Sequence, residues 1–206
     1  MRTLTLATLA LLAALPAAAQ QGSGQLPAGW QARTDKDAPL DGVKFAPMGG
    51  GVHATTGPAV ILWRPADQVE GDFALAASFT QTRAPEHPEA YGLFVGGKAL
   101  QSPEQSYTYF LVRQDGKFLI KTRTGTTTTN VTTGWAEHPA VVKADAAGKA
   151  TNALRVEQAG GRVRFLVNGT EVHSAAAADV ATGGQAGLRI NHNLDVHVDG
   201  LVLEKK

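Results

Sequence analysis

Apolar and polar side chains alternate along much of this chain in short runs. The clearest run covers residues 73–80, where Phe73, Leu75 and Phe79 stand at alternate positions among small or polar residues. Because successive side chains of a strand point to opposite faces, this run predicts a strand with one buried face. Similar runs recur between glycine, proline and Asn-Gly turns, and we find no long amphipathic helix. The pattern predicts roughly ten to twelve short strands in an all-β, two-sheet antiparallel jelly-roll sandwich.

Residues 106–124 give the strongest signal for a pair of strands, joined at Asp115-Gly116. Asp-Gly favours a hairpin because glycine accepts a positive φ. A two-residue loop would swap the two faces of the second strand relative to a three-residue loop. We predict the three-residue loop over residues 114–116, because it gathers the large apolar side chains on one face. These side chains are Phe110, Val112, Phe118 and Ile120.

The opposite face of this hairpin is a candidate ligand-binding surface. It carries Tyr107, Tyr109, Arg113, Lys121 and Arg123. We expect this face to be open, because buried Arg and Lys need partners. Tyrosine rings fit the apolar faces of sugars, and the cationic side chains donate to hydroxyls or carboxylates. The alternative is that the tyrosines only pack across the strands.

Other aromatic residues and histidines raise the same choice between binding and packing. Trp135 and His138 follow the hairpin in an irregular stretch and are further binding candidates. For Trp135 the alternative is packing, and for His138, in a Glu-His-Pro sequence, it is a plain loop position. Trp63 lies in a strongly apolar strand over residues 59–63, which Pro65 ends, and we assign it to the core.

The last third of the chain reads as a meander with two tight turns. Gly160-Gly161 and Asn168-Gly169 each separate two alternating runs. Both pairs tolerate the positive φ values that two-residue hairpin loops require. We therefore predict two-residue hairpins at both places.

The first residues read as a secretory signal peptide. Arg2 precedes an apolar run over residues 4–15, and three alanines at 17–19 form a small-residue cleavage site. The run is shorter than the ~20 residues of a membrane-spanning helix. We expect residues 1–19 to be removed, residues 20–27 to form a flexible tail, and residues 28–206 to form the sandwich. The protein is then secreted or periplasmic.

Charge and cysteine content narrow the class of partner. Without residues 1–19 the chain has equal numbers of acidic and basic side chains, which argues against nucleic acid or an anionic membrane as a partner. The chain has no cysteine, so it has no disulfide and no thiol chemistry. Export without disulfides fits a bacterial periplasm or culture medium.

The order of the strand and turn motifs resembles the concanavalin A-like sandwich of secreted bacterial proteins. The motifs are Gly71-Asp72-Phe73, Tyr91-Gly92-Leu93, residues 107–116, 152–156 and 165–169, Gly187-Leu188-Arg189 and residues 196–199. More narrowly, residues 70–203 are similar to the domain of 3-keto-disaccharide hydrolases and of laminin-G-like modules. The resemblance implies two curved sheets with sugar ligands on the concave face or its rim. The Glu-x-Asp-x-x-Glu strand of the superfamily's glycoside-cleaving branch has no counterpart here.

No catalytic residue, cofactor or metal is assigned from the sequence. Motifs for serine hydrolases, zinc proteases and phosphate-binding loops are absent. Asp72 and Asp199 are candidates for a structural calcium site, and the alternative is ordinary turn chemistry. We read the chain as a secreted carbohydrate-binding module. The alternatives are a hydrolase or lyase of 3-keto-glycosides, with His138, His192 or a carboxylate as acid–base, and a structural or adhesive module of the cell envelope.

Overall fold

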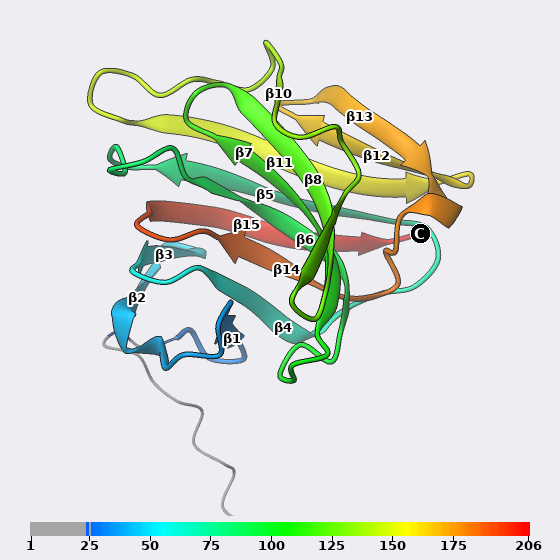
Figure 1. Cartoon of the computed structure of the whole chain (residues 1–206), viewed down its shortest axis with the longest axis horizontal. Coiled ribbons are helices and arrows are strands. Elements are labelled where there is room, and N and C mark those ends of the chain that lie inside the picture. The colour runs from blue at the N-terminus through cyan, green and yellow to red at the C-terminus, as the bar shows by residue number, and fades with distance from the viewer. Residues whose placement is uncertain (1–23, 25) are drawn as a thin grey trace, which may run out of the picture.

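Two antiparallel β-sheets face one another in the computed structural model, which describes residues 24 and 26–206 (Figure 1). Sheet A has the order β1 (Gln31–Thr34), β4 (Val60–Val69), β14 (Gly184–Ile190), β6 (Ala90–Lys98), β7 (Ser106–Arg113), β8 (Lys117–Thr124) and β10 (Ala136–Glu137), with β9 (Thr127–Asn130) also paired to β8. Sheet B has the order β13 (Thr170–Ala176), β12 (Arg162–Val167), β11 (Ala150–Ala159), β5 (Phe73–Gln81), β15 (Asp195–Lys205), β3 (Gly51–Thr56) and β2 (Val43–Met48). Two short 3-10 turns, η1 (Leu40–Gly42) and η2 (Ala177–Asp179), join strands. The predicted two-sheet sandwich is confirmed.

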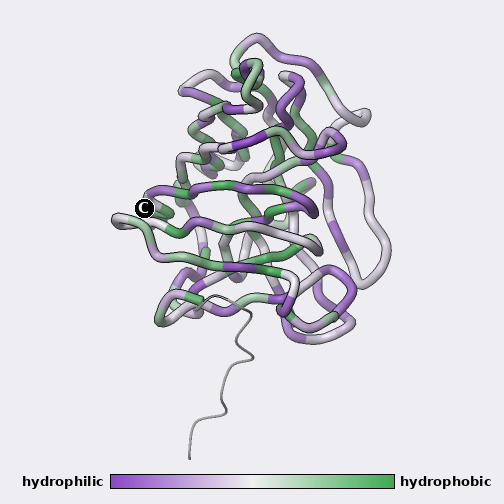
Figure 2. The backbone as a smooth tube through the Cα atoms, turned by 90° about the vertical axis from the view of Figure 1, so that its left-hand side faces the viewer, coloured by the Kyte–Doolittle hydropathy of each residue, from purple (hydrophilic) through white to green (hydrophobic). Residues whose placement is uncertain are grey.

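The main core lies between the two sheets and takes alternate residues from both. In β5 the fully buried side chains Phe73, Leu75 and Phe79 point into it, as the alternating pattern predicts. Sheet A contributes Leu93 and Phe110 among others. Figure 2 shows hydrophobic and hydrophilic segments alternating along the tube, which is the pattern expected when each strand has one buried face.

The hairpin at the centre of the sequence has the predicted loop. Arg113 pairs with Lys117, so residues 114–116 form a three-residue loop, and Gly116 has φ +85°. Phe110 and its partner Ile120 therefore point into the main core. The positive φ at Gly116 explains why the loop needs a glycine there.

The two predicted tight turns of the last third are also confirmed. Ala159 pairs with Arg162, and Val167 pairs with Thr170, so each loop has two residues. Asn168 has φ +50° and Gly169 has φ +82°. Both values lie in the left-handed region that a hairpin of this kind requires.

Gly169→Val tests the turn chemistry. A Cβ at Gly169 would meet no atom within 4 Å, so the cost is conformational rather than steric crowding. A β-branched residue at positive φ is strained, and we expect about 1–3 kcal/mol of lost stability. Urea denaturation measures this change, and an unaltered midpoint would contradict the assigned φ.

Three local expectations differ from the structure, and all three concern sheet A. The strand that Pro65 was expected to end continues to Val69, because residues 64–67 of β4 bulge opposite the single residue Ala186 of β14. Pro65, which has no N–H to donate, falls in this unpaired stretch. The Gly96-Gly97 pair likewise predicts the end of a strand that begins at Tyr91, but β6 runs past it to Lys98, and Gly96 has φ +70° at a second bulge. Strand β1, in a stretch that reads as mostly polar, was not predicted.

Segments for which the sequence left two interpretations open are now defined. Residues 125–134, rich in threonine and readable as an exposed strand or a loop, contain the exposed strand β9. Residues 174–181, readable as a short helix or a loop, first continue β13 to Ala176 and then form the 3-10 turn η2. The predicted signal peptide at residues 1–19, and residues 20–23 and 25 of the predicted tail, lie outside the described residues. Within the described residues, no helix has the length and apolar character to cross a membrane.

Candidate functional site

A second apolar cluster, here called the outer cluster, lies on the face of sheet A that points away from sheet B. It consists of Ile61, Trp63, Ala90, Phe94, Leu100, Tyr107, Tyr109 and Leu111. Its strand residues alternate with those of the main core, so they point to the opposite face. Three of its rings are close together, with centroids of Phe94 and Tyr107 5.3 Å apart and those of Tyr107 and Tyr109 5.8 Å apart.

The predicted tyrosine face exists, but it is not open. Tyr109 pairs with Lys121, and Tyr107 pairs with Arg123, so these four side chains share one face as predicted. Tyr107 is only 1% exposed and Tyr109 only 6% exposed. The expectation of an open face is therefore wrong. The two arginines of this face do find partners, Arg113 in Asp115 and Arg123 in Asp35, which allows the tyrosines to be buried.

Asp35 supplies the negative charge that closes this face. Its carboxylate accepts hydrogen bonds from Nη1 and Nη2 of Arg189 at 2.6 and 2.7 Å, and it lies 3.1 Å from Nη1 of Arg123. Arg189 also donates to the Tyr107 hydroxyl at 2.8 Å. We call this set of contacts the Asp35 bridge.

The Asp35 bridge shows that sheet A is curled. Asp35 directly follows β1 at one edge of the sheet, whereas Arg123 lies in β8, and β4, β14, β6 and β7 stand between them in the strand order. A direct contact between the two is possible only when the outer face is strongly concave. The bridge therefore spans the concave face and covers the tyrosines. A ligand can then reach this face of sheet A only beside the bridge.

The charges of the bridge stabilise one another. Burial disfavours the charged form of Asp35, but the hydrogen bonds and positive charges of Arg189 and Arg123 lower its pKa below the usual value. Burial raises the pKa of Tyr107 and Tyr109, so both remain neutral hydroxyls at physiological pH. Arg189 stays charged although it is buried, because the Asp35 carboxylate holds it in bidentate geometry.

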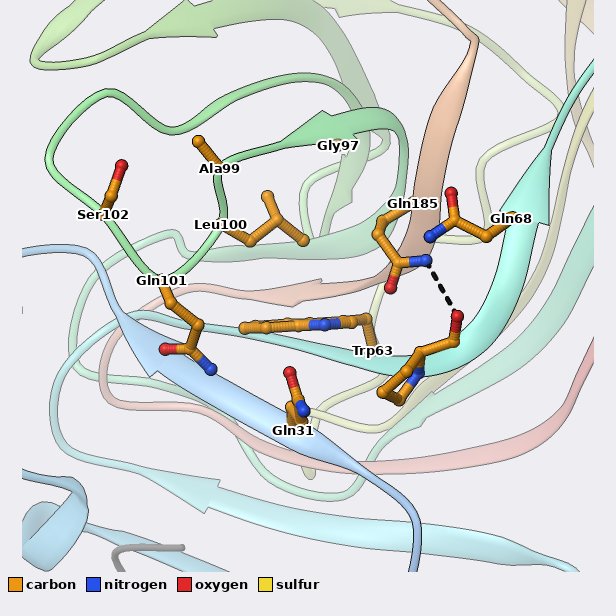
Figure 3. Close-up of a pocket in the computed structure, with 10 residues that line it drawn as sticks. Gln31, Trp63, Gln68, Gly97, Ala99, Leu100, Gln101, Ser102 and Gln185 are labelled. Carbon is orange, nitrogen blue, oxygen red and sulfur yellow. Dashed lines mark hydrogen bonds between the residues drawn. The ribbon is translucent and has the colours of Figure 1, made fainter. Parts of the chain in front are cut away.

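A cavity of about 380 Å³ opens on the same side of sheet A, next to Trp63 (Figure 3). Its lining comes from β1, β4, β6, β14 and the loop after β6. The residues are Gln31, Trp63, Pro65, Gln68, Gly97, Ala99, Leu100, Gln101, Ser102 and Gln185. Figure 3 shows Leu100 and Gln31 on opposite sides of the Trp63 ring. Trp63 is only 3% exposed, so neighbouring residues hold its ring in place and the cavity reaches only the edge of that ring.

Four carboxamides surround this ring. Gln31, Gln68 and Gln101 are exposed, and Gln185 is half-buried and donates to the carbonyl oxygens of Pro65 and Asp67 at 3.2 and 3.4 Å. A carboxamide both donates and accepts hydrogen bonds, as a hydroxyl group does. All ten lining residues are uncharged. The cavity thus combines an aromatic edge with neutral polar groups.

Backbone irregularities shape the cavity. Gly187 allows β4 and the Phe94 ring to approach β14 closely, since an added Cβ would clash with the Leu62 carbonyl oxygen and come within 2.7 Å of that ring. The bulge of β4 opposite Ala186 contains Pro65, and Pro65 and Gln185 both line the cavity. Sequence reasoning missed this site, because Trp63 reads as a core residue and the glutamines come from separate strands and a loop.

The other predicted site residues lie apart from the cavity. The Arg113 guanidinium stacks over the Trp135 ring at 4.5 Å from its centroid and pairs with Asp115. Trp135 is therefore packed on one side, and it is 36% exposed. His138 packs its ring against Phe118, and its Nδ1 accepts a hydrogen bond from the amide of Ala140. His138 therefore does not join the tyrosine face.

A histidine–carboxylate pair lies at the far end of β6. His192 Nε2 is 2.9 Å from the buried Glu89 carboxylate, which also accepts a hydrogen bond from Asn191. Glu89 precedes the first residue of β6, whereas Gly97 of the cavity lies near its last residue, so the pair does not belong to the cavity.

The calcium candidates do not form a common site in the described part of the chain. Asp72 accepts a long hydrogen bond from the amide of Gly160, and Asp199 pairs with His197. Among the described residues, no three His, Asp or Glu side chains gather as metal ligands would.

Comparison of the fold identifies similar sandwiches. No protein family model and no curated protein matches the chain. Among solved structures, the carbohydrate binding module CBM66 from Bacillus subtilis matches with a TM-score of 0.60 at 13% identity, over 86% of this chain and 96% of that one. A Bacillus subtilis protein of unknown function with a galectin-like fold matches with a TM-score of 0.59 at 13% identity, over 85% of this chain and 88% of that one. The Ca2+/Man-bound form of the VIP36 exoplasmic/lumenal domain matches with a TM-score of 0.54 at 12% identity, over 92% of this chain and 90% of that one.

These likenesses define the class of fold. The chain has the concanavalin A-like, two-sheet antiparallel sandwich fold that its strand and turn motifs predict. Several of its structural neighbours are carbohydrate-binding or lectin-like proteins. At these low identities the comparison extends to the fold and not to the ligand.

Proposed function

We propose that this protein binds a neutral carbohydrate in the Trp63 cavity. The observation that carries the proposal is the lining, in which four carboxamides surround one aromatic edge and no lining residue is charged. Sugar hydroxyls need partners that both donate and accept, and the apolar faces of a sugar ring need an apolar contact. The concanavalin A-like fold, with carbohydrate-binding proteins among its neighbours, supports the same proposal.

The charges around the cavity favour a neutral ligand over an acidic one. No lining residue is charged, and two arginines close to lining residues in the chain are already paired: Arg33 bonds to Asp37, and Arg64 donates to Asp67 at 2.6 Å. A carboxylate or phosphate that enters the cavity would lose water without gaining a charged partner from the lining itself, which is costly. We therefore expect neutral oligosaccharides to bind in preference to uronates or sugar phosphates. A glycan array that contains both kinds tests this expectation.

Removing single carboxamides should weaken binding without unfolding the protein. We expect Gln101→Ala to lower the affinity for the strongest neutral hit of the array by roughly 2- to 10-fold, the effect of one hydrogen bond. Its stability should not change, because the side chain is exposed. Titration calorimetry measures the affinity, with Gln68→Ala as a second test.

Lys44→Ala is the matched control, because Lys44 is an exposed polar residue of β2 at the far edge of sheet B. Unchanged binding in both glutamine variants would refute the cavity as the binding site.

The two alternatives have their own outcomes. Release of reducing sugar from 3-keto-glycosides, lost in His192→Ala, would favour the enzyme and would move the site to the His192–Glu89 pair. Retention on cell-wall material without binding to any soluble glycan would favour the envelope module. The leader-like pattern of residues 1–19 supports our further proposal that the protein acts outside the cytoplasm.

A further inference from the structure

The Trp63 cavity has two walls that come from distant parts of the chain. One wall is β1, which carries Gln31, and the other is the loop after β6, which carries Leu100, Gln101 and Ser102. Gln31 and Leu100 lie on opposite sides of the Trp63 ring (Figure 3). The distance between these walls decides what can reach the ring edge.

Arg33 joins the two walls. It lies two residues after Gln31 on the same face of β1, and it is buried. Its Nη1 donates to the carbonyl oxygen of Ser102 at 2.9 Å and makes a longer contact of 3.5 Å with that of Leu100. Its Nε donates to Asp37 at 3.1 Å, which fixes the guanidinium plane.

We propose that Arg33 is a positioning residue that sets the width of the Trp63 cavity, and thereby its affinity and its selectivity for ligand size. This inference rests on the proposed function for its binding consequences. Arg33 does not line the cavity; it acts through Leu100, Ser102 and the strand it shares with Gln31. A planar guanidinium reaches the loop carbonyls and Asp37 at the same time, whereas the compact ammonium of a lysine does not present donors in that fixed arrangement.

Arg33→Lys keeps the charge and tests the geometry alone. We expect amide hydrogen exchange to speed up in residues 98–105 and not elsewhere, with little change in melting temperature. Maltotriose, cellotriose, mannotriose and their monosaccharides are the binding probes. The best trisaccharide should lose roughly tenfold in affinity, the effect of a hydrogen bond to a charged group. The monosaccharide should lose less, so the ratio of the two affinities should fall.

Arg155→Lys is the matched control, because Arg155 also pairs with a carboxylate, Glu157, but lies in sheet B. Unchanged exchange in residues 98–105, or faster exchange throughout the chain, would overturn the positioning role. An equal loss for trisaccharide and monosaccharide would overturn the role in selectivity. If no neutral sugar binds the wild-type protein, the proposed function fails, and the exchange experiment still decides whether Arg33 holds the wall.

Discussion

Asp35→Asn is expected to destabilise the fold by about 3 kcal/mol, although the exchange removes only one charge. The substitution leaves Arg189 buried without its carboxylate, and removing one partner of a buried pair costs about 3–5 kcal/mol. We choose the low end of this range because the Asp35 side chain is 26% exposed. Chemical denaturation of both proteins at neutral pH measures the difference.

Asp37→Asn is the matched control for this experiment. Asp37 also pairs with an arginine, Arg33, but its side chain is 66% exposed. Such pairs contribute roughly 0–1 kcal/mol, and Asn tolerates the positive φ of this position. Equal effects of the two substitutions would show that the Asp35 bridge is no stronger than an ordinary surface pair.

The pH dependence gives an independent measurement of the same bridge. The pKa of Asp35 is lowered in the folded protein, so its stabilising effect is complete above the unfolded value of about 3.9 and is lost as the pH falls through the folded value. The difference in stability between wild type and Asp35→Asn should therefore be constant from pH 7 to 5 and shrink below about pH 4. A difference that shrinks already between pH 7 and 5 would contradict the lowered pKa.

Local pattern was enough to predict the two-sheet sandwich and the faces of the central hairpin. The alternation of Phe73, Leu75 and Phe79 and the choice of a three-residue loop depend on neighbouring residues only. The tight turn at Asn168 is likewise decided by two residues that accept positive φ. The bulges near Pro65 and Gly96 were missed, because a bulge depends on the register with a partner strand.

The candidate site was not predictable in the same way, because its contacts join distant residues. Asp35 and Arg189 are 154 positions apart, and the sequence gives no sign that a carboxylate near β1 covers the tyrosines of β7. Buried Arg does need a partner, but the sequence does not identify Asp35 as that partner, and the face was therefore expected to be open. The Trp63 cavity escaped for a related reason, since its four glutamines gather only when β1, β4, β14 and the loop after β6 come together.

The structure changes what is expected of the two neighbouring aromatic residues in β7. From the sequence alone, Tyr109 was a binding candidate on a face expected to be open, and Phe110 lay on the opposite, apolar face. Tyr109 is now seen to be buried in the outer cluster, with the Arg189 guanidinium 4.9 Å above its ring. Both substitutions to alanine should therefore lower stability, but by different amounts.

Phe110→Ala should cost about 3–5 kcal/mol, as truncation of a buried aromatic in a core does. The Phe110 ring packs against Phe118 of its own sheet, with ring centroids 6.4 Å apart, and against Phe165 of sheet B, with ring centroids 5.4 Å apart. Its loss therefore leaves a cavity between the two sheets. Tyr109→Ala removes a ring that contacts one sheet only, and we expect about 1.5–3 kcal/mol from the lost burial. Denaturant titration of the two variants ranks their losses of stability. The slopes of free energy against denaturant concentration should match that of the wild type, which confirms that both variants still unfold in one step. A larger loss for Tyr109→Ala would mean that the outer cluster, and not the space between the sheets, contributes most to the stability of this strand.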